Sequence, residues 1–408
     1  MKMTKYKLGE LVEVTRGASL SGQFYAEEGK LIRLTLGNFN MNGGGFKENT
    51  SKTDLYFTGT VRDEFILNKG DIITPLTEQS LGLLGTTARI PESGKYIQSQ
   101  DVALVRCKEG LLDPNFCYYL ISSSIVRQQL SAAAQQTKIR HTSPEKIKDC
   151  TVWVPDFYTQ KNIGRILTDI DNKIAINRRI NDNLEAMAKQ LYDYWFVQFD
   201  FPNEEGKPYK SNGGAMVYNE KLKREIPQGW NISQIKDFMR IFTGKKDVSK
   251  AVPGNYKFFS CAPEPITSNE YIYDGYAVLV SGNGSYTGRV GFYKGKFDLY
   301  QRTYACVLDK EVRNISFFYY TLRYLFQPIY SGGKHGSSIP YIVLGDLADF
   351  RFVFNEMVCK KFVDIVTPMF DEQLLRLQEI EELTKQRDEL LPLLMNGQAS
   401  VNYHLSAC

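Results

Sequence analysis

The 408-residue sequence has little of what metal binding, disulfide bonding or membrane insertion requires. It has only three histidines and no group of four Cys and His residues at the spacing of a zinc site. The seven cysteines are odd in number and scattered through apolar runs, which is typical of a protein from a reducing cytoplasm. No apolar run approaches the roughly 18 residues that span a bilayer, and no signal-peptide core is visible. We therefore expect a cytoplasmic protein that binds no metal of its own and no membrane.

The sequence also lacks a recognisable catalytic motif. The glycine-rich run 280–288 follows a predicted strand, as a dinucleotide loop would, but residues 289–293 predict a second strand and not the helix that would bind phosphate. There is no Asn/Asp-Pro-Pro-aromatic motif for amino-group methylation and no acidic pair with a lysine placed as in nucleases. We therefore expect no catalytic residues and no cofactor in this chain.

What the sequence has is an internal repeat. Residues 147–154 match 347–354, Tyr118-Tyr119 match Tyr319-Tyr320, and 103–105 match 305–307. The repeated unit is too long for a solenoid, and 43% hydrophobic and 13% aromatic residues suffice for two separate cores. The pattern predicts two globular domains of mixed α/β (α+β) character in tandem.

A long helical pattern follows each copy, and apolar residues alternate there at spacings of three and four, as in a coiled coil. At a rise of 1.5 Å per residue, about forty residues make a helix of roughly 60 Å. We expect the two helices to pair antiparallel. Asn177 either fixes the register inside this seam or faces solvent. The predicted seam residues are Ile163, Ile166, Ile170, Asn177, Ile180, Leu184, Met187 and Leu191 in the first helix, and Phe362, Ile365, Met369, Leu377, Ile380, Leu383, Leu390 and Leu394 in the second.

These patterns divide the chain into six segments. They are a first domain at 1–157, a long helix at 158–198, a linker at 199–229, a second domain at 230–354, a second long helix at 355–396 and a tail at 397–408.

Charge differs between these segments although the net charge is only +4. The first domain has 19 basic and 17 acidic residues, and residues 199–354 have 20 and 15. The second long helix has 5 basic and 9 acidic residues. A polyanion is therefore expected to meet the domains and to avoid the second helix, although a surplus this small is common on other proteins.

The helical segments carry specific sequence motifs. The runs 160–174, 181–185 (NDNLE) and 191–196 (LYDYWF) strongly resemble the central conserved helix of specificity subunits of type I restriction-modification systems. The run 387–398 (RDELLPLLMNGQ) resembles the second conserved helix of that family, and 227–230 (PQGW) resembles the entry to its second target-recognition domain. The resemblance spans the chain, whereas the domains match only in outline.

This resemblance implies a DNA-recognition subunit without catalytic activity. Each domain would read one half of a bipartite, asymmetric target in double-stranded DNA, and the helix pair would set the spacer and dock two methyltransferase subunits. Those partners would use S-adenosylmethionine, and restriction/translocase subunits would use ATP and Mg. The alternatives are a two-headed protein-binding scaffold without DNA specificity and an enzyme that uses the 282–288 loop.

Candidate DNA-contacting residues are polar or cationic side chains in loops and at strand edges that recur between the copies. They are Arg16, Gln100, Lys138 and Arg140 in the first domain, and Lys245, Lys246, Arg289, Arg302, Lys334 and Ser337 in the second.

Overall fold

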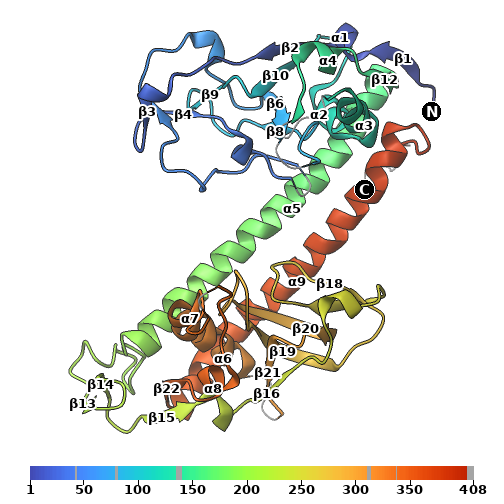
Figure 1. The fold of residues 1–408 in the computed structure, drawn as a ribbon. Coiled ribbons are helices and arrows are strands. Elements are labelled where there is room, and N and C mark those ends of the chain that lie inside the picture. Colours follow the sequence, from blue (N-terminus) through green and yellow to red (C-terminus); the bar gives the residue numbers. More distant parts are fainter. Residues whose placement is uncertain (42–43, 79–80, 135–139, 310–313, 337, 402–408) are drawn as a thin grey trace. The chain divides into compact units, whose positions relative to one another are not determined.

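The computed structural model describes residues 1–41, 44–78, 81–134, 140–309, 314–336 and 338–401. The chain divides into two compact units, both of which mix strands and helices (Figure 1). The first comprises Met1–Asn177 and Glu379–Cys408, and the second comprises Arg178–Gln378. Each unit therefore holds one predicted domain and part of each long helix. In the described part of the chain, no helix is both long enough and apolar enough to cross a bilayer.

Twelve strands are described in the first unit. They are β1 (Thr4–Lys7), β2 (Val12–Arg16), β3 (Tyr25–Ala26), β4 (Leu31–Arg33), β5 (Tyr56–Phe57), β6 (Ile72–Pro75), β7 (Thr77–Glu78), β8 (Ala88–Arg89), β9 (Tyr96–Ile97), β10 (Val102–Cys107), β11 (Arg140–His141) and β12 (Thr151–Val154). Two four-stranded sheets have the orders β2-β10-β6-β8 and β3-β5-β4-β9, and β1 pairs with β12 and β7 with β11. Among these described pairings, β4–β9 is parallel and the others are antiparallel.

Four shorter helices accompany these strands: α1 (Leu8–Leu11), α2 (Pro114–Ser122), α3 (Ser124–Ala133) and α4 (Pro144–Lys148). α2 begins at Pro114 because the Asp113 carboxylate accepts hydrogen bonds from the N–H groups of Asn115 and Phe116. Strand β10 is buried on both faces. Ala103 and Val105 pack in the core that contains α2, and the alternate residues Val102 and Leu104 pack in a separate core.

Ten strands are described in the second unit: β13 (Met216–Asn219), β14 (Arg224–Pro227), β15 (Asn231–Gln234), β16 (Arg240–Thr243), β17 (Tyr256–Phe259), β18 (Ile266–Ser268), β19 (Tyr273–Ser281), β20 (Val290–Leu299), β21 (Thr303–Val307) and β22 (Arg351–Phe354). Six form one sheet in the order β16-β21-β19-β20-β17-β18. β15 pairs with β22 as β1 does with β12 in the first unit. The hairpin β13–β14 occupies the segment that the sequence predicts as a linker.

The helical layer of the second unit is rich in aromatic residues. It contains α6 (Ile315–Thr321), the π-helical turn η8 (Leu322–Phe326), α7 (Gln327–Tyr330) and, further along the chain, α8 (Leu344–Ala348). Phe317, Phe318 and Tyr320 of α6 are buried. They pack in one core with the sheet residues Val278 and Val280 and with residues of both long helices.

The long helices are α5 (Phe157–Tyr192), which continues into the π-helical turn η4 (Asp193–Val197), and α9 (Glu356–Met395). In the first unit, Asp171 of α5 pairs with Arg387 of α9, and Asn177 pairs with Glu379. Along this contact the residue number in α9 falls from 387 to 379 while the residue number in α5 rises from 171 to 177, so the two helices run antiparallel there.

The second unit shows the same direction. Gln373 of α9 bonds to the Asn181 carbonyl oxygen of α5. Phe362, earlier in α9, lies against Tyr192, later in α5, with ring centroids 5.9 Å apart. The antiparallel pairing predicted from the sequence is therefore present in each unit.

Burial along the helices departs in part from the predicted seam. Ile163, Asn177, Phe362 and Leu394 are buried. Asn177 donates a hydrogen bond from Nδ2 to Glu379 Oε2 at 2.9 Å, so it lies inside the pair and does not face solvent. Partly buried positions are Ile166, Ile170, Ile180, Leu184, Leu191, Met369, Ile380, Leu383 and Leu390.

Three predicted seam residues are exposed, and the prediction is wrong for them. Met187, Ile365 and Leu377 have 51%, 44% and 51% of their surface exposed. In part of α5 the error is one of phase, because the buried residues Leu167 and Ala188 each lie one residue after a predicted position, Ile166 or Met187. Spacings of three and four alone fit either phase.

Candidate nucleic-acid interface

Three loops of the second unit are joined by backbone hydrogen bonds beyond the end of β19. The Gly282 N–H donates to the Arg302 carbonyl oxygen at 2.9 Å, and the Ile342 N–H donates to the Gly282 carbonyl oxygen at 2.9 Å. The Gly284 N–H bonds to the Pro340 carbonyl oxygen at 3.0 Å. A Cβ on Gly282 would overlap the Arg302 carbonyl, so glycine is needed for this close approach. The three loops are therefore held together beyond the end of β19.

Each unit also has a glycine directly after an edge strand of one of its sheets, β2 in the first unit and β16 in the second. A Cβ on Gly17, after β2, would overlap the carbonyl oxygens of Gln98 and Ser99. A Cβ on Gly244, after β16, would overlap the carbonyl oxygen of Leu299. In the first unit this contact holds the loop after β2 against the residues just before β10, which is the sheet neighbour of β2. In the second unit it holds the loop after β16 against the residues just before β21, which is the sheet neighbour of β16. The repeat therefore positions the same two loops in each domain.

In the first unit these loops bring together two predicted DNA-contacting residues. Arg16 Nε donates to the Gln100 carbonyl oxygen at 2.9 Å, and both residues are exposed. A polar hollow of about 330 Å³ lies beside Gln100 and is lined by Asn49, Ser51 and Lys52, among others. No sequence pattern nominates these three residues, since only the fold brings the 49–52 turn to residue 100.

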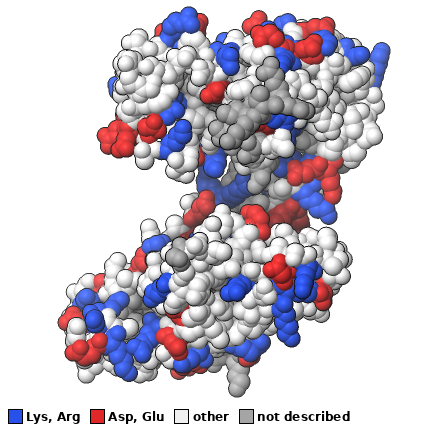
Figure 2. Space-filling model, in the orientation of Figure 1, with Lys and Arg blue, Asp and Glu red and all other residues white. Residues whose placement is uncertain are grey.

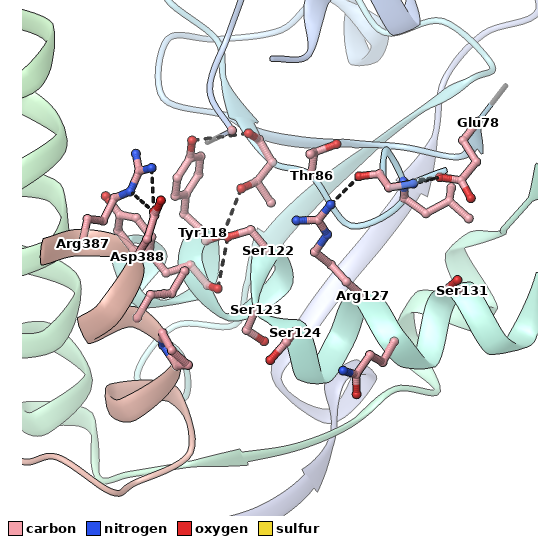
Figure 3. Close-up of a pocket in the computed structure, with 18 residues that line it drawn as sticks. Glu78, Thr86, Tyr118, Ser122, Ser123, Ser124, Arg127, Ser131, Arg387 and Asp388 are labelled. Carbon is pink, nitrogen blue, oxygen red and sulfur yellow. Dashed lines mark hydrogen bonds and ion pairs between the residues drawn. The ribbon is translucent and has the colours of Figure 1, made fainter. Parts of the chain in front are cut away.

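A larger crevice of about 590 Å³ lies between α2, α3 and the last turns of α9 in the first unit (Figure 3). Arg127 donates to the Gly82 carbonyl oxygen, and Arg387 bonds to Asp388 at 2.8 Å. Many of its described polar groups thus bond to one another. The crevice is consequently better described as the junction between α9 and the first domain than as a receptor for a polar ligand.

Charge on the domains is mixed. On the face drawn in Figure 2, Lys and Arg side chains are interspersed with Asp and Glu. Arg289 illustrates how local bonding competes with surface charge: it donates to the Ala262 and Pro263 carbonyl oxygens at 2.5 and 3.1 Å, and burial lowers its pKa. A count of basic residues therefore overstates the number of cations that are available to phosphate groups.

Comparison with known proteins identifies the family. The family model described as type I restriction modification DNA specificity domain matches residues 1–186 and 227–383. The chain belongs to this family. Each matched stretch contains one domain and part of the long helix that follows it, so this specificity subunit carries the family domain twice.

Individual relatives agree. The subunit is 24% identical over 324 residues to the type I restriction enzyme MjaIX specificity subunit of Methanocaldococcus jannaschii, covering 72% of this chain and 71% of that protein. It is 32% identical over 180 residues to the EcoDI specificity subunit of Escherichia coli, covering 43% and 39%. The crystal structure of the type-I restriction-modification system S subunit from M. genitalium has a TM-score of 0.61 at 18% identity and covers 97% of this chain and 96% of that one. At this identity the structural likeness concerns the fold.

Three of the nominated cations of the specificity subunit are held by internal partners. Arg140 Nη1 lies 3.0 Å from Glu78 Oε1, and Lys246 Nζ lies 2.8 Å from Asp298 Oδ2. Both carboxylate side chains are only 1% exposed. Moving either cation to a phosphate would leave a buried charge unpaired. Arg140, Lys246 and Arg289 therefore hold loops in place, and their nomination as DNA contacts stays a prediction.

The remaining nominated residues that the structure describes are all exposed. Lys245, Arg302 and Lys334 are exposed, and Lys334 Nζ lies 4.2 Å from the centroid of the Tyr330 ring. Lys138 and Ser337 lie outside the described residues. Arg16, Gln100, Lys245, Arg302 and Lys334 thus stay as candidates for DNA contact.

Proposed function

We propose that each domain of this specificity subunit reads one half of a bipartite, asymmetric DNA target. The observation that carries the proposal is one framework present twice with different loop residues. The same kind of glycine contact anchors the loop that follows β2 (Gly17-Ala18-Ser19) and the loop that follows β16 (Gly244-Lys245-Lys246), so that equivalent loops present different side chains. Base edges are read by such side chains, whereas the framework only orients them.

The helix pair is proposed to set the spacer between the two half-sites. In support, β12 ends at Val154 and α5 begins at Phe157, and β22 ends at Phe354 and α9 begins at Glu356. Each helix thus leaves its domain through a two-residue or one-residue connection, which leaves little freedom between them. Deleting one heptad from α5 or α9 is expected to change the permitted spacer and to leave both half-sites unchanged. An unchanged spacer would contradict this part of the proposal.

The exposed side of each helix pair is proposed to dock one methyltransferase subunit, two in all. The support for this is the set of large apolar side chains that the two helices leave exposed. In the first unit, Tyr158 and Ile176 are 69% and 56% exposed. In the second unit, Met187, Met357 and Leu377 are 51%, 70% and 51% exposed. Two of these, Met187 and Leu377, were predicted to lie in the seam.

Catalysis is proposed to belong to the partners. The methyltransferase subunits would use S-adenosylmethionine to methylate adenine N6, and restriction/translocase subunits would use ATP and Mg. The specificity subunit contributes the reading of sequence and the geometry in which the partners act.

The test is methylome sequencing of cells that express the subunit with its methyltransferase, compared with cells that lack only the subunit. The proposal expects N6-methyladenine at a split motif only when the subunit is present. Unchanged methylation, with a folded partner that still binds the subunit, would instead favour a scaffold without DNA specificity.

A further inference from the structure

The helix pair of the first unit contains a charged contact. Arg387 Nη1 bonds to Asp171 Oδ1 at 2.9 Å, and the two side chains are 11% and 29% exposed. Asp171 also accepts a hydrogen bond from the Tyr119 hydroxyl at 2.6 Å. The Arg387 guanidinium bonds in addition to the neighbouring Asp388, on its own helix. Its position against α5 therefore depends on a carboxylate at residue 171.

The second unit has different residues at the matching places. The Tyr320 hydroxyl, which corresponds to that of Tyr119 in the repeat, lies 3.5 Å from Gln373 Oε1. Gln373 Nε2 in turn lies 3.4 Å from Glu185 Oε2. Asp171 of α5 thus corresponds to Gln373 of α9, and Arg387 of α9 corresponds to Glu185 of α5. As a result α5 has acids at both places, whereas α9 has an amide and a cation.

The first unit has a second polar contact along its helix pair. Asn177, only 2% exposed, donates to Glu379 Oε2 at 2.9 Å, and Lys173 forms an ion pair with Glu379. Asn177 lies six residues after Asp171, and Glu379 lies six residues after Gln373, so these two also correspond in the repeat. Both of these partners of the Glu379 carboxylate belong to α5.

We propose that these polar residues admit the pairing of α5 with α9 and exclude the pairing of either helix with its counterpart in a second copy of the chain. Two α5 helices in the same antiparallel register would place Asp171 against Glu185 on both sides. Two α9 helices would place Glu379 against Glu379 and remove Asn177 and Lys173 from it. Like charges in these partly buried positions oppose both arrangements.

The apolar residues of the seam do not make this distinction. Both helices offer aliphatic side chains at matching spacings, and a chain built from two similar halves is a natural candidate for exchange of helices between copies. Fixing register is the best-attested use of a polar residue inside a helix pair, and charged pairs between helices set the choice of partner. The inference concerns assembly and does not rest on the proposed reading of DNA.

The test compares four full-length proteins: the unchanged chain, Asp171→Arg, Asp171→Arg/Arg387→Asp, and the control Asp169→Arg, which reverses an exposed charge of α5 two residues away. Self-association is measured by sedimentation over a range of concentrations and by co-purification of two differently tagged copies. Asp171→Arg places two cations together within its own pair and lets the introduced guanidinium meet Glu185 in a second copy. We expect at least a tenfold rise in association for this variant alone, and reversal in the double variant.

Two outcomes would overturn the inference: Asp171→Arg that associates no more than Asp169→Arg, or a double variant that associates as strongly as the single one. If Asp171→Arg proves unfolded by circular dichroism, Asp171→Asn and Glu379→Gln replace it. Glu379→Gln removes the repulsion between two α9 helices, so it is expected to raise association, and no rise in either milder variant would contradict the inference.

Discussion

The two domains share a framework next to the long helices and differ further away. In both, a first strand pairs with the strand before the long helix, and the central orders β2-β10-β6 and β16-β21-β19 are antiparallel. Beyond these strands the first domain has a separate four-stranded sheet, whereas the second extends one sheet to six strands. The shared part connects each domain to its long helix, and the domains differ in the strands beyond it.

The largest effects that we expect are losses of stability on breaking the ion pair to a buried carboxylate in each domain, and they show whether this pair stabilises both domains equally. Arg140→Ala in the first domain and Lys246→Ala in the second each leave a buried carboxylate unpaired, at a cost of about 3–5 kcal/mol in unfolding free energy. Denaturant unfolding of each variant measures it. The control is Lys236→Ala, whose exposed pair with Asp349 is expected to contribute less than about 1 kcal/mol. Equal losses in all three would contradict a buried structural role.

The next effect separates the domains. Tyr119→Phe removes a 2.6 Å bond to a carboxylate and is expected to cost about 1.5–3 kcal/mol. Tyr320→Phe removes only a 3.5 Å contact with an amide, so its cost should stay below about 1 kcal/mol. Thermal unfolding of both variants measures the difference. If Tyr320→Phe were the more damaging change, the charged contact of the first unit would not be the stronger one.

A third comparison concerns the recognition of the DNA sequence by each domain. Arg16→Ala and Arg302→Ala alter exposed side chains, so stability should change by less than about 0.5 kcal/mol. If either contacts a base, discrimination falls by about 1–3 kcal/mol at that position. Methylome sequencing should then show Arg16→Ala relaxing one half of the motif and Arg302→Ala relaxing the other. Relaxation of the same half by both would contradict one domain per half-site.

A weaker effect is expected at alkaline pH. Burial and the bonded carboxylates, Asp171 and Glu185, raise the pKa of Tyr119 in the first unit and of Tyr324 in the second above the ordinary 10.0. The folded state binds the hydroxyl protons of these two tyrosines more tightly than the unfolded state does. Their contribution to the free energy of unfolding is therefore complete below pH 10 and is lost as pH rises through the raised pKa values. Unfolding measured from about pH 8 to about pH 11 should show the loss, and Tyr324→Phe should reduce it.

The duplication, the long helices and the antiparallel pairing could be predicted because they rest on periodicity and repeated residues. The exact alignment of the strands could not. The sequence match of 103–105 with 305–307 aligns Val105 with Val307. In the structure, however, the residues that occupy the helix-facing cores of the two units are Val105 and Cys306. Since side chains alternate along a strand, a shift of one residue reverses the face. Short apolar runs contain too little pattern to fix that shift.

The site was less predictable than the fold for a different reason. Arg140 and Arg16 are both loop-edge cations in the sequence, yet one bonds to the buried Glu78 and the other is exposed. Their partners lie 62 and 84 residues away, at Glu78 and Gln100. Only the fold decides which cation is held internally, so loop position and charge nominate candidates without ranking them.

The assignment of one domain to each half-site is best tested by replacing residues 230–354 with the corresponding domain of another specificity subunit and sequencing the methylome. We predict that one half of the methylated motif changes to that of the donor, while the other half and the spacer stay the same. A change in both halves, or in neither with methylation retained, would contradict this assignment.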